Sequence, residues 1–216
     1  MFEREREHVA SSARRLAALG LTLGTAGNVS TRAGELICVT PTGAVLEHVR
    51  ADEISVVDSD GELVDGPPPT SELALHLGAY ARFAPAAVVH AHAPTATALA
   101  CVLDELPAVH YQMVELGGAV RVARYETFGT PELAAATLDA IEGRRAVLMA
   151  NHGTLTFGDD LDQAVARAQL LEWVSTLYFK AAMLGSPRTL DERQLDEVRA
   201  QLTRRRYGSL TGEGVR

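Results

Sequence analysis

The sequence predicts a single domain with a mixed α/β sandwich fold. Its 216 residues suit one domain with a sizeable core. Short apolar segments typical of strands are interspersed with longer segments whose apolar residues recur at helical spacing. Asp60-Gly61, between two of the short segments, indicates a hairpin turn. A hairpin argues against a purely parallel sheet, so we expect a mixed one.

Helical spacing and helix-end residues define the predicted helices. Val9 and Leu16 belong to the apolar stripe of the first helix. The second follows three consecutive prolines, and Thr70 or Ser71 can cap it with Glu72 in its first turn. Two later helices open on a proline. The predicted helices span residues 2–19, about 71–83, 94–102, 131–143, 160–184 and 190–206.

The predicted strands are short apolar runs bounded by turn residues. They span residues 36–40, 54–58, 62–64, 86–91, 120–125 and 146–150. The run over 86–91 leads into His90-Ala91-His92, and the run over 146–150 leads into Asn151-His152-Gly153. We predict one domain over residues 1–208 and a flexible tail over 209–216.

Composition excludes several classes of protein. The chain is 47% hydrophobic and 22% charged, which argues against disorder. A net charge of −8 with 5% aromatic residues is a poor match for a protein that binds nucleic acid or an anionic membrane. We find neither a signal peptide nor an apolar run near the roughly 18 residues that span a bilayer. Cys38 and Cys101 lie far apart in the sequence, so we expect a cytoplasmic protein with reduced thiols.

Three histidines at strand ends predict a metal site. His90 and His92 are two positions apart, so on a strand they point to one face, roughly 6–7 Å apart. Alone, the pair could equally be two unrelated histidines. His152 follows another buried strand and would complete a set of three nitrogens with one coordination position open, and Glu72 could supply a fourth ligand. Such a set suits Zn²⁺ better than Mg²⁺ or Ca²⁺.

The other histidines carry weaker signals. His76 lies four residues after Glu72 on the same helical face, where it could support that carboxylate or simply belong to the core. His8 and His48 lie in polar, exposed segments, and His110 is more typical of a structural histidine than of a ligand.

Three short loops of small polar residues could together hold a phosphate group. Hydroxyls, amides and free backbone N–H groups in such loops form anion-binding nests. Thr70-Ser71 adds the positive end of a helix dipole. Each loop alone would be read as an ordinary turn. The chain has a single lysine, Lys180, so a phosphate held by these neutral donors would fit the composition, and a Schiff-base reaction would depend on that one residue. The loops span residues 25–28, 40–43 and 70–71.

These motifs resemble the class II aldolase/adducin family, and within it the aldolases that act on L-fuculose 1-phosphate. The likeness covers nearly the whole chain in order, so it is more specific than one motif. Its one small departure is Thr70 in place of a serine, which keeps the hydroxyl. The matching stretches are residues 24–30, 40–43, 70–72, 88–92, 107–111, 127–130, 151–153 and 206–208.

The resemblance implies a predominantly antiparallel sheet between helical layers and a homotetramer with active sites between subunits. It implies zinc on His90, His92 and His152, with Glu72 as a resting ligand and as the acid/base. It implies cleavage of a ketose 1-phosphate to dihydroxyacetone phosphate and an aldehyde, with Tyr111 as second acid/base in the neighbour's site. Phe128 and Tyr207 would line the site from a neighbouring subunit or the C-terminal segment. Thr25, Asn28, Thr42, Gly43, Thr70 and Ser71 would hold the phosphate.

Two kinds of alternative stay open. A pentulose-phosphate 4-epimerase or a methylthioribulose-phosphate dehydratase would share the metal ligands. His110-Tyr111 and Arg206-Tyr207-Gly208 favour the aldolase. A non-catalytic adducin-like interaction module would have no need of the histidines, the carboxylate and the phosphate loops together. The sequence leaves the sugar open among fuculose, rhamnulose, ribulose and 5-deoxypentulose phosphates.

Overall fold

The computed structural model describes residues 2–205. Tyr207 and the predicted tail lie outside the described residues. Within them, the chain forms a nine-stranded sheet with the order β4-β3-β2-β1-β5-β9-β8-β7-β6. Its strands are β1 (Asn28–Ala33), β2 (Leu36–Val39), β3 (Ser55–Val57), β4 (Leu63–Asp65), β5 (Ala87–Ala91), β6 (Glu105–Leu106), β7 (Val120–Ala123), β8 (Ala146–Met149) and β9 (Gly153–Gly158).

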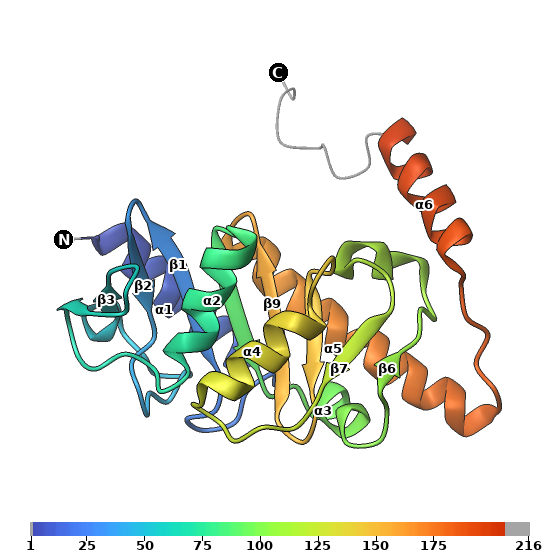
Figure 1. Cartoon of the computed structure of the whole chain (residues 1–216), viewed down its shortest axis with the longest axis horizontal. Coiled ribbons are helices and arrows are strands. Elements are labelled where there is room, and N and C mark those ends of the chain that lie inside the picture. Colours follow the sequence, from blue (N-terminus) through green and yellow to red (C-terminus); the bar gives the residue numbers. More distant parts are fainter. Residues whose placement is uncertain (1, 206–216) are drawn as a thin grey trace.

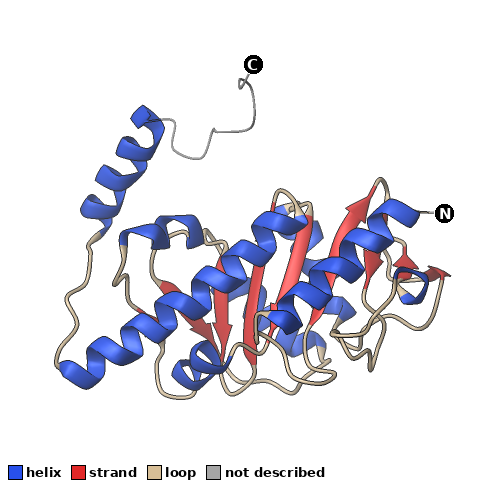
Figure 2. Ribbon diagram, turned by 180° about the vertical axis from the view of Figure 1, so that it is seen from behind, coloured by secondary structure: helices blue, strands red, loops and turns tan. Residues whose placement is uncertain are grey.

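Helices cover both faces of this sheet. Helices α2 and α4 lie on the near face in Figure 1, and α1 and α5 cross the opposite face in Figure 2. Helix α6 projects from the end of the sheet that carries β6. No helix within residues 2–205 is long and apolar enough to cross a membrane. The helices are α1 (Glu3–Ala18), α2 (Leu73–Phe83), α3 (Pro94–Ala100), α4 (Pro131–Ala140), α5 (Leu161–Leu184) and α6 (Glu192–Arg205), with 3-10 turns η1 (Ala51–Glu53) and η2 (Tyr111–Leu116).

The sheet separates two hydrophobic cores. On β5, Val88 packs into the core beneath α2 and α4, and Val89 packs into the core beneath α1, α3 and α5. This alternation is the two-residue period of a strand, and both faces of the central strands are therefore apolar.

The expected fold is confirmed: the sheet is predominantly antiparallel and lies between helical layers. Only β7 and β8 pair in parallel among the neighbouring strands of the described chain. Strands β1, β6 and β9 were not predicted. β1 buries Asn28 and Ser30, whose polar groups are satisfied by residues of α2 far along the chain, so local apolarity gave no signal. Glu72 is the N-cap of α2 and does not lie in its first turn.

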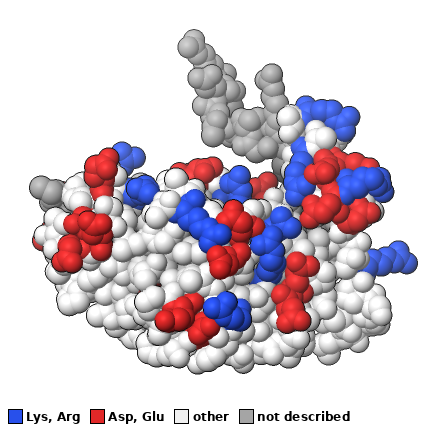
Figure 3. Space-filling view, in the orientation of Figure 1, with Lys and Arg blue, Asp and Glu red and all other residues white. Residues whose placement is uncertain are grey.

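Charged side chains of both signs are interspersed over the face that carries α2 and α4 (Figure 3). Arg82 on α2, for example, lies 2.6 Å from Asp139, in the last turn of α4, and 2.7 Å from Glu142, just after that helix. Such exposed pairs contribute little stability individually. They leave this face without a large region of one sign.

Candidate active site

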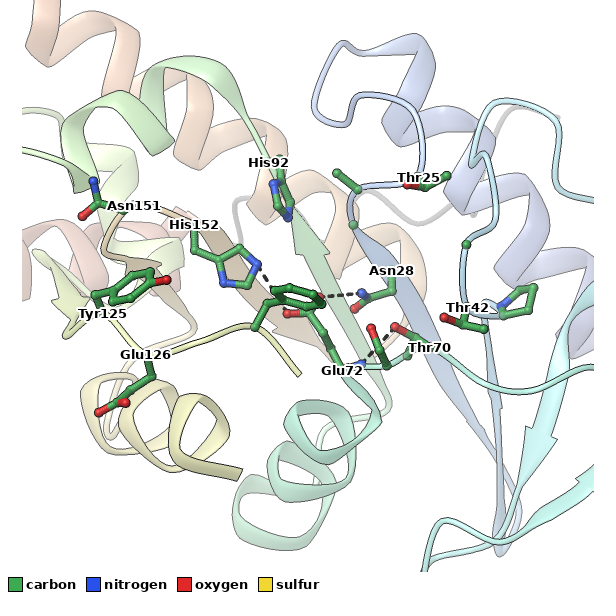
Figure 4. A pocket seen from close by; sticks show the side chains of 16 residues that line it. Thr25, Asn28, Thr42, Thr70, Glu72, His92, Tyr125, Glu126, Asn151 and His152 are labelled. Carbon is green, nitrogen blue, oxygen red and sulfur yellow. Dashed lines mark hydrogen bonds and ion pairs between the residues drawn. The ribbon is translucent and has the colours of Figure 1, made fainter. Parts of the chain in front are cut away.

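Strand pairing brings distant motifs to one end of the sheet. Asn28, the first residue of β1, pairs with His90 near the end of β5. On the other side of β5, Ala91 pairs with Thr154 of β9, a strand that begins at Gly153, directly after His152. Helix α2 begins at Leu73, so its N-cap Glu72 lies at the same end. Figure 4 shows Glu72, Asn28, His92 and His152 facing one another there.

The three predicted histidines form a compact group that could hold a metal ion. The ligand nitrogens of His90, His92 and His152 all lie within 4.8 Å of one another. His90 Nε2 and His92 Nε2 are 2.9 Å apart. His90 Nδ1 lies 2.9 Å from the carbonyl oxygen of Thr154, which requires an N–H on Nδ1. The Nε2 atom of His90 then presents its lone pair to the centre of the group, as a metal ligand must.

Glu72 completes the group with a carboxylate. Its Oε2 lies 3.1 Å from His90 Nε2, and its Oε1 lies 3.4 Å from His152 Nε2. Asn28 Nδ2 donates a hydrogen bond of 2.9 Å to Oε2, whereas Oε1 is buried without a hydrogen-bond partner. A buried carboxylate oxygen without a donor, aimed at histidine nitrogens, fits a site for a cation.

The electrostatics of the group favour the protonation states that bind metal. Burial alone would raise the pKa of Glu72, but the neighbouring His90 ring and the hydrogen bond from Asn28 hold that pKa well below its usual range. Burial, and then the neighbouring His90 and His152 rings, lower the pKa of His92 to about 3. Burial also lowers the pKa of His152. An ionised carboxylate beside neutral imidazoles is the state that a metal ion requires.

Gly153 allows the two histidine segments to meet. A Cβ atom at this position would lie 2.5 Å from the carbonyl oxygen of Ala91, 3.2 Å from His90 Cε1 and 3.3 Å from His92 Cδ2. Real Cβ contacts are not that short, so any side chain here would force β5 and β9 apart. The glycine is therefore a packing requirement of the metal group.

The three polar loops line one pocket of about 360 Å³ beside the histidines. Backbone hydrogen bonds join two of the loops: Thr42 N donates to Pro68 O over 3.1 Å, and Thr70 N donates to Thr40 O over 3.1 Å. Among the described residues that line the pocket there is no lysine or arginine. An anion in this pocket would therefore be held by neutral donors. The predicted phosphate residues that line it are Thr25, Asn28, Thr42, Gly43, Thr70 and Ser71.

The other residues singled out in the sequence lie at different distances from this pocket. Phe128 lines the pocket of its own chain, and its expected role at a neighbouring subunit's site stays a prediction. Tyr111 is 46% exposed on η2, outside this pocket, where its ring lies 4.6 Å from that of His110. Lys180 is exposed on α5. His76 is fully buried beneath the site, hydrogen-bonded to Asn28.

Three lining residues were missed by sequence reasoning. Tyr125 and Glu126 follow β7, and Asn151 follows β8. Because β7 and β8 are parallel neighbours, both strands deliver the residues after them to the same edge. The two short apolar runs that precede these residues were visible in the sequence, but their parallel pairing was not.

The fold and this site define a class: α/β proteins that can place a metal ion beside a pocket for an anion. Residues 7–179 match the family model described as the class II aldolase and adducin N-terminal domain. The chain belongs to this family. The predicted family is thereby confirmed. The prediction that the protein is an enzyme of the lyase class is confirmed as well, because the similar proteins are named aldolases.

Similar proteins include several named aldolases. A 5-deoxy-D-ribulose 1-phosphate aldolase of Bacillus thuringiensis is 34% identical over 92% of this chain and 95% of its own length. The L-fuculose phosphate aldolase of Escherichia coli K12 is 36% identical over 78% of this chain and 80% of its own. A solved structure of an L-fuculose 1-phosphate aldolase superposes with a TM-score of 0.89 at 35% identity, covering 93% of this chain and 96% of that one.

Proposed function

We propose that this chain is a zinc-dependent class II aldolase that cleaves a ketose 1-phosphate to dihydroxyacetone phosphate and an aldehyde. One observation carries the proposal: a group of three histidines and a buried carboxylate borders the same pocket as three loops of neutral donors. A sugar phosphate needs both, since its phosphate must be held while its carbonyl is polarised.

Each residue then has a chemical role. His90, His92, His152 and, at rest, Glu72 hold the ion, which when bound supplies Lewis-acid polarisation of the substrate carbonyl. Cleavage breaks the bond between C3 and C4 of the ketose, and the electron pair stays on the dihydroxyacetone phosphate side. Tyr111 takes the proton of the C4 hydroxyl as the aldehyde forms, and Glu72 then donates a proton to C3. In the reverse direction, Glu72 removes that C3 proton as a base.

The phosphate is held without cations from the chain. Ser71 and Thr25 are exposed to the pocket and can donate hydroxyl hydrogen bonds, and the loop at Gly43 can offer backbone N–H groups. Binding energy from the phosphate, which does not react, can orient the reacting carbons. The named relatives act on 5-deoxyribulose, 5-methylthioribulose and L-fuculose phosphates, so these are the substrate candidates.

The site is proposed to be complete only in an oligomer, a tetramer as the family resemblance implies. Tyr111 lies outside the pocket of its own chain and is exposed. Large apolar side chains are also exposed on α5, including Trp173 at 47% and, farther along the helix, Met183 at 73%. His110 links the two regions, with its ring 4.8 Å from that of Trp173. Burial of this surface against a second copy would bring Tyr111 to the neighbour's pocket.

The test is a cleavage screen with zinc-loaded protein and the three candidate ketose 1-phosphates, with dihydroxyacetone phosphate as the measured product. The aldolase releases it from at least one of them. An epimerase would instead convert one pentulose phosphate to another, and a dehydratase would release water without breaking the carbon chain. Either of those products, or no reaction with any sugar phosphate, would reject the aldolase.

The metal assignment has its own test. His92→Ala removes one of three nitrogen ligands, so we expect purified variant protein to lose most of its zinc, against about one zinc per chain in the wild type. His48→Ala is the matched control, because His48 is exposed and lies outside the group. Full zinc content in His92→Ala, measured by elemental analysis, would contradict the ligand set.

A further inference from the structure

A line of buried hydrogen bonds runs from the carboxylate of Glu72 into the core. Asn28 Nδ2 donates to Glu72 Oε2 over 2.9 Å. The other end of the same amide, Oδ1, lies 2.5 Å from His76 Nε2, and His76 Nδ1 lies 2.6 Å from Ser30 Oγ. Ser30 Oγ is 2.7 Å from the hydroxyl of Tyr80. All five residues are buried, and His76 and Ser30 have no exposed surface.

Hydrogen-bond chemistry fixes the direction of this line. An ionised carboxylate only accepts, so the Asn28 amide must present its NH₂ to Glu72 and its oxygen to His76. That oxygen also only accepts, so His76 carries its proton on Nε2. In the neutral ring Nδ1 is then an acceptor, and Ser30 donates to it. Burial, and then His90, lower the pKa of His76 to about 3, which keeps the ring neutral at neutral pH.

We propose that His76 is a positioning residue for Glu72, acting through the Asn28 amide. Leaving aside the histidines of the metal group, Asn28 is the one described residue whose side chain donates a hydrogen bond to the Glu72 carboxylate. The donor on His76 Nε2 locks the amide against rotation. Rotation would turn the amide oxygen toward the carboxylate, and the resulting repulsion would displace Glu72. The proposal rests on the proposed function, in which Glu72 must leave a ligand role and still be aimed at the reacting carbon.

The same contacts change the role of Asn28. The sequence suggests Asn28 as a phosphate ligand, but its side-chain amide donates one N–H to Glu72 and accepts from His76, which leaves a single N–H for any phosphate. A ligand of the phosphate would influence substrate binding, whereas a residue that aims Glu72 influences the chemical step. The two roles therefore differ in whether KM or kcat changes.

The experiment is a double-mutant cycle in the zinc-loaded protein. His76→Phe keeps a planar ring and removes the donor, and Asn28→Ala removes the amide. We expect kcat to fall about 10- to 100-fold in each, the usual range for lost support of a site residue, with zinc content unchanged and KM changed less than about threefold. Because His76 acts through Asn28, the double variant is no slower than Asn28→Ala alone. His76→Gln retains an amide donor and recovers part of the rate.

Nitrogen NMR of histidine-labelled protein gives a readout that needs no catalysis. The His76 ring in the wild type shows a protonated Nε2 and an unprotonated Nδ1 at neutral pH, and Asn28→Ala weakens that preference. If the wild type cleaves no ketose phosphate but shows this tautomer, the proposed function fails while the hydrogen-bond line stands. Additive losses in the double variant, a raised KM with unchanged kcat, or protonated Nδ1 in the wild type would each overturn the positioning role. Should His76→Phe not fold, Asn28→Ala, His76→Gln and the NMR measurement still decide.

Discussion

Glu72 lies where the start of α2, the pocket and the histidine group come together. It precedes α2, it borders the pocket beside Ser71, and its oxygens lie 3.1 and 3.4 Å from two histidine nitrogens. Its Oε1 has no hydrogen bond, so that oxygen is free to contact an ion, and Oε2 is held by Asn28. A carboxylate with one fixed and one free oxygen can alternate between ligand and base without losing its place.

Replacing Glu72 by Gln tests the base directly. The substitution keeps the size of the side chain and removes its basicity, so we expect kcat to fall by roughly 10²–10⁴, the range for loss of a general base. Zinc is largely retained because three histidine nitrogens remain. Steady-state cleavage rates and metal content measure the two effects.

Exchange of the C3 proton of dihydroxyacetone phosphate with deuterated solvent gives an independent check. That exchange needs the same proton transfer without the aldehyde, so it slows in parallel with cleavage. A zinc-loaded Glu72→Gln protein that exchanges this proton at the wild-type rate would assign the base to another group.

Much of the site could be predicted from single residues, because metal binding depends on a few residue types at particular spacings. The histidine pair with spacing of two and the third strand-end histidine indicated a metal group, and the structure brings all three together. The sequence indicated that His76 could support the Glu72 carboxylate, but not that Asn28 lies between the two. Their partners lie 44 to 48 residues away, and only the pairing of β1 with β5 and the docking of α2 place them in contact.

At the scale of elements, the contact between β5 and β9 controls the geometry of the metal group. Strand β9 was not predicted, and its first residue is a glycine, which strands disfavour. In the structure, a Cβ at that glycine would lie 2.5 Å from the carbonyl oxygen of Ala91 on β5, so the two strands leave no room for a side chain. The close packing of the two backbones thus explains the glycine.

Gly153→Ala should therefore weaken the site through the sheet. The added methyl would meet the backbone of Ala91, so we expect a loss of about 1–3 kcal/mol in the free energy of unfolding, as for other overpacked positions. Displacement of His90 and His92 should lower zinc affinity about 10- to 100-fold. Thermal unfolding and zinc titration measure these changes.

Gly78→Ala is the matched control. A Cβ at Gly78 would meet Leu138 Cδ1, in the packing of α2 against α4 rather than beside the histidines. Because that atom ends a flexible side chain and alanine is favoured over glycine in a helix, the free energy of unfolding changes less than in Gly153→Ala, and the zinc affinity stays at the wild-type value. Equal zinc affinities in the two glycine variants would mean that the β5–β9 contact does not control the metal group.

The polar loops make a second prediction at this scale. Ser71 is exposed in the pocket at the start of α2, where its hydroxyl can donate to a phosphate. A hydrogen bond to a charged group contributes about 1.5–3 kcal/mol, so Ser71→Ala should raise KM for the ketose phosphate roughly 10- to 100-fold. Ser71→Thr keeps the hydroxyl and should retain most of the affinity. An unchanged KM together with an unchanged kcat in Ser71→Ala would remove this loop from the phosphate site.

At the scale of the whole molecule, the proposed function needs a second chain, because Glu72 lines the pocket of its own chain and Tyr111 does not. Exposed Tyr111 and Trp173 lie on the flank formed by η2 and α5, away from the pocket. Large exposed apolar groups gathered in one region are typical of an interface. A symmetric ring of copies would bring this flank of each chain to the pocket of the next.

Mixing two inactive variants tests this arrangement. Glu72→Gln and Tyr111→Phe each disable every site of a pure oligomer. In a randomly exchanged 1:1 mixture, a site that combines Glu72 of one chain with Tyr111 of its neighbour is intact with a probability of about one quarter, so about one quarter of wild-type activity should return. Mixing Glu72→Gln with His92→Ala is the control, because both residues belong to the same chain's site and no hybrid is intact. Verified subunit exchange without recovery in the first mixture would place Tyr111 and Glu72 in a single chain, and the oligomer would then have no part in completing the site.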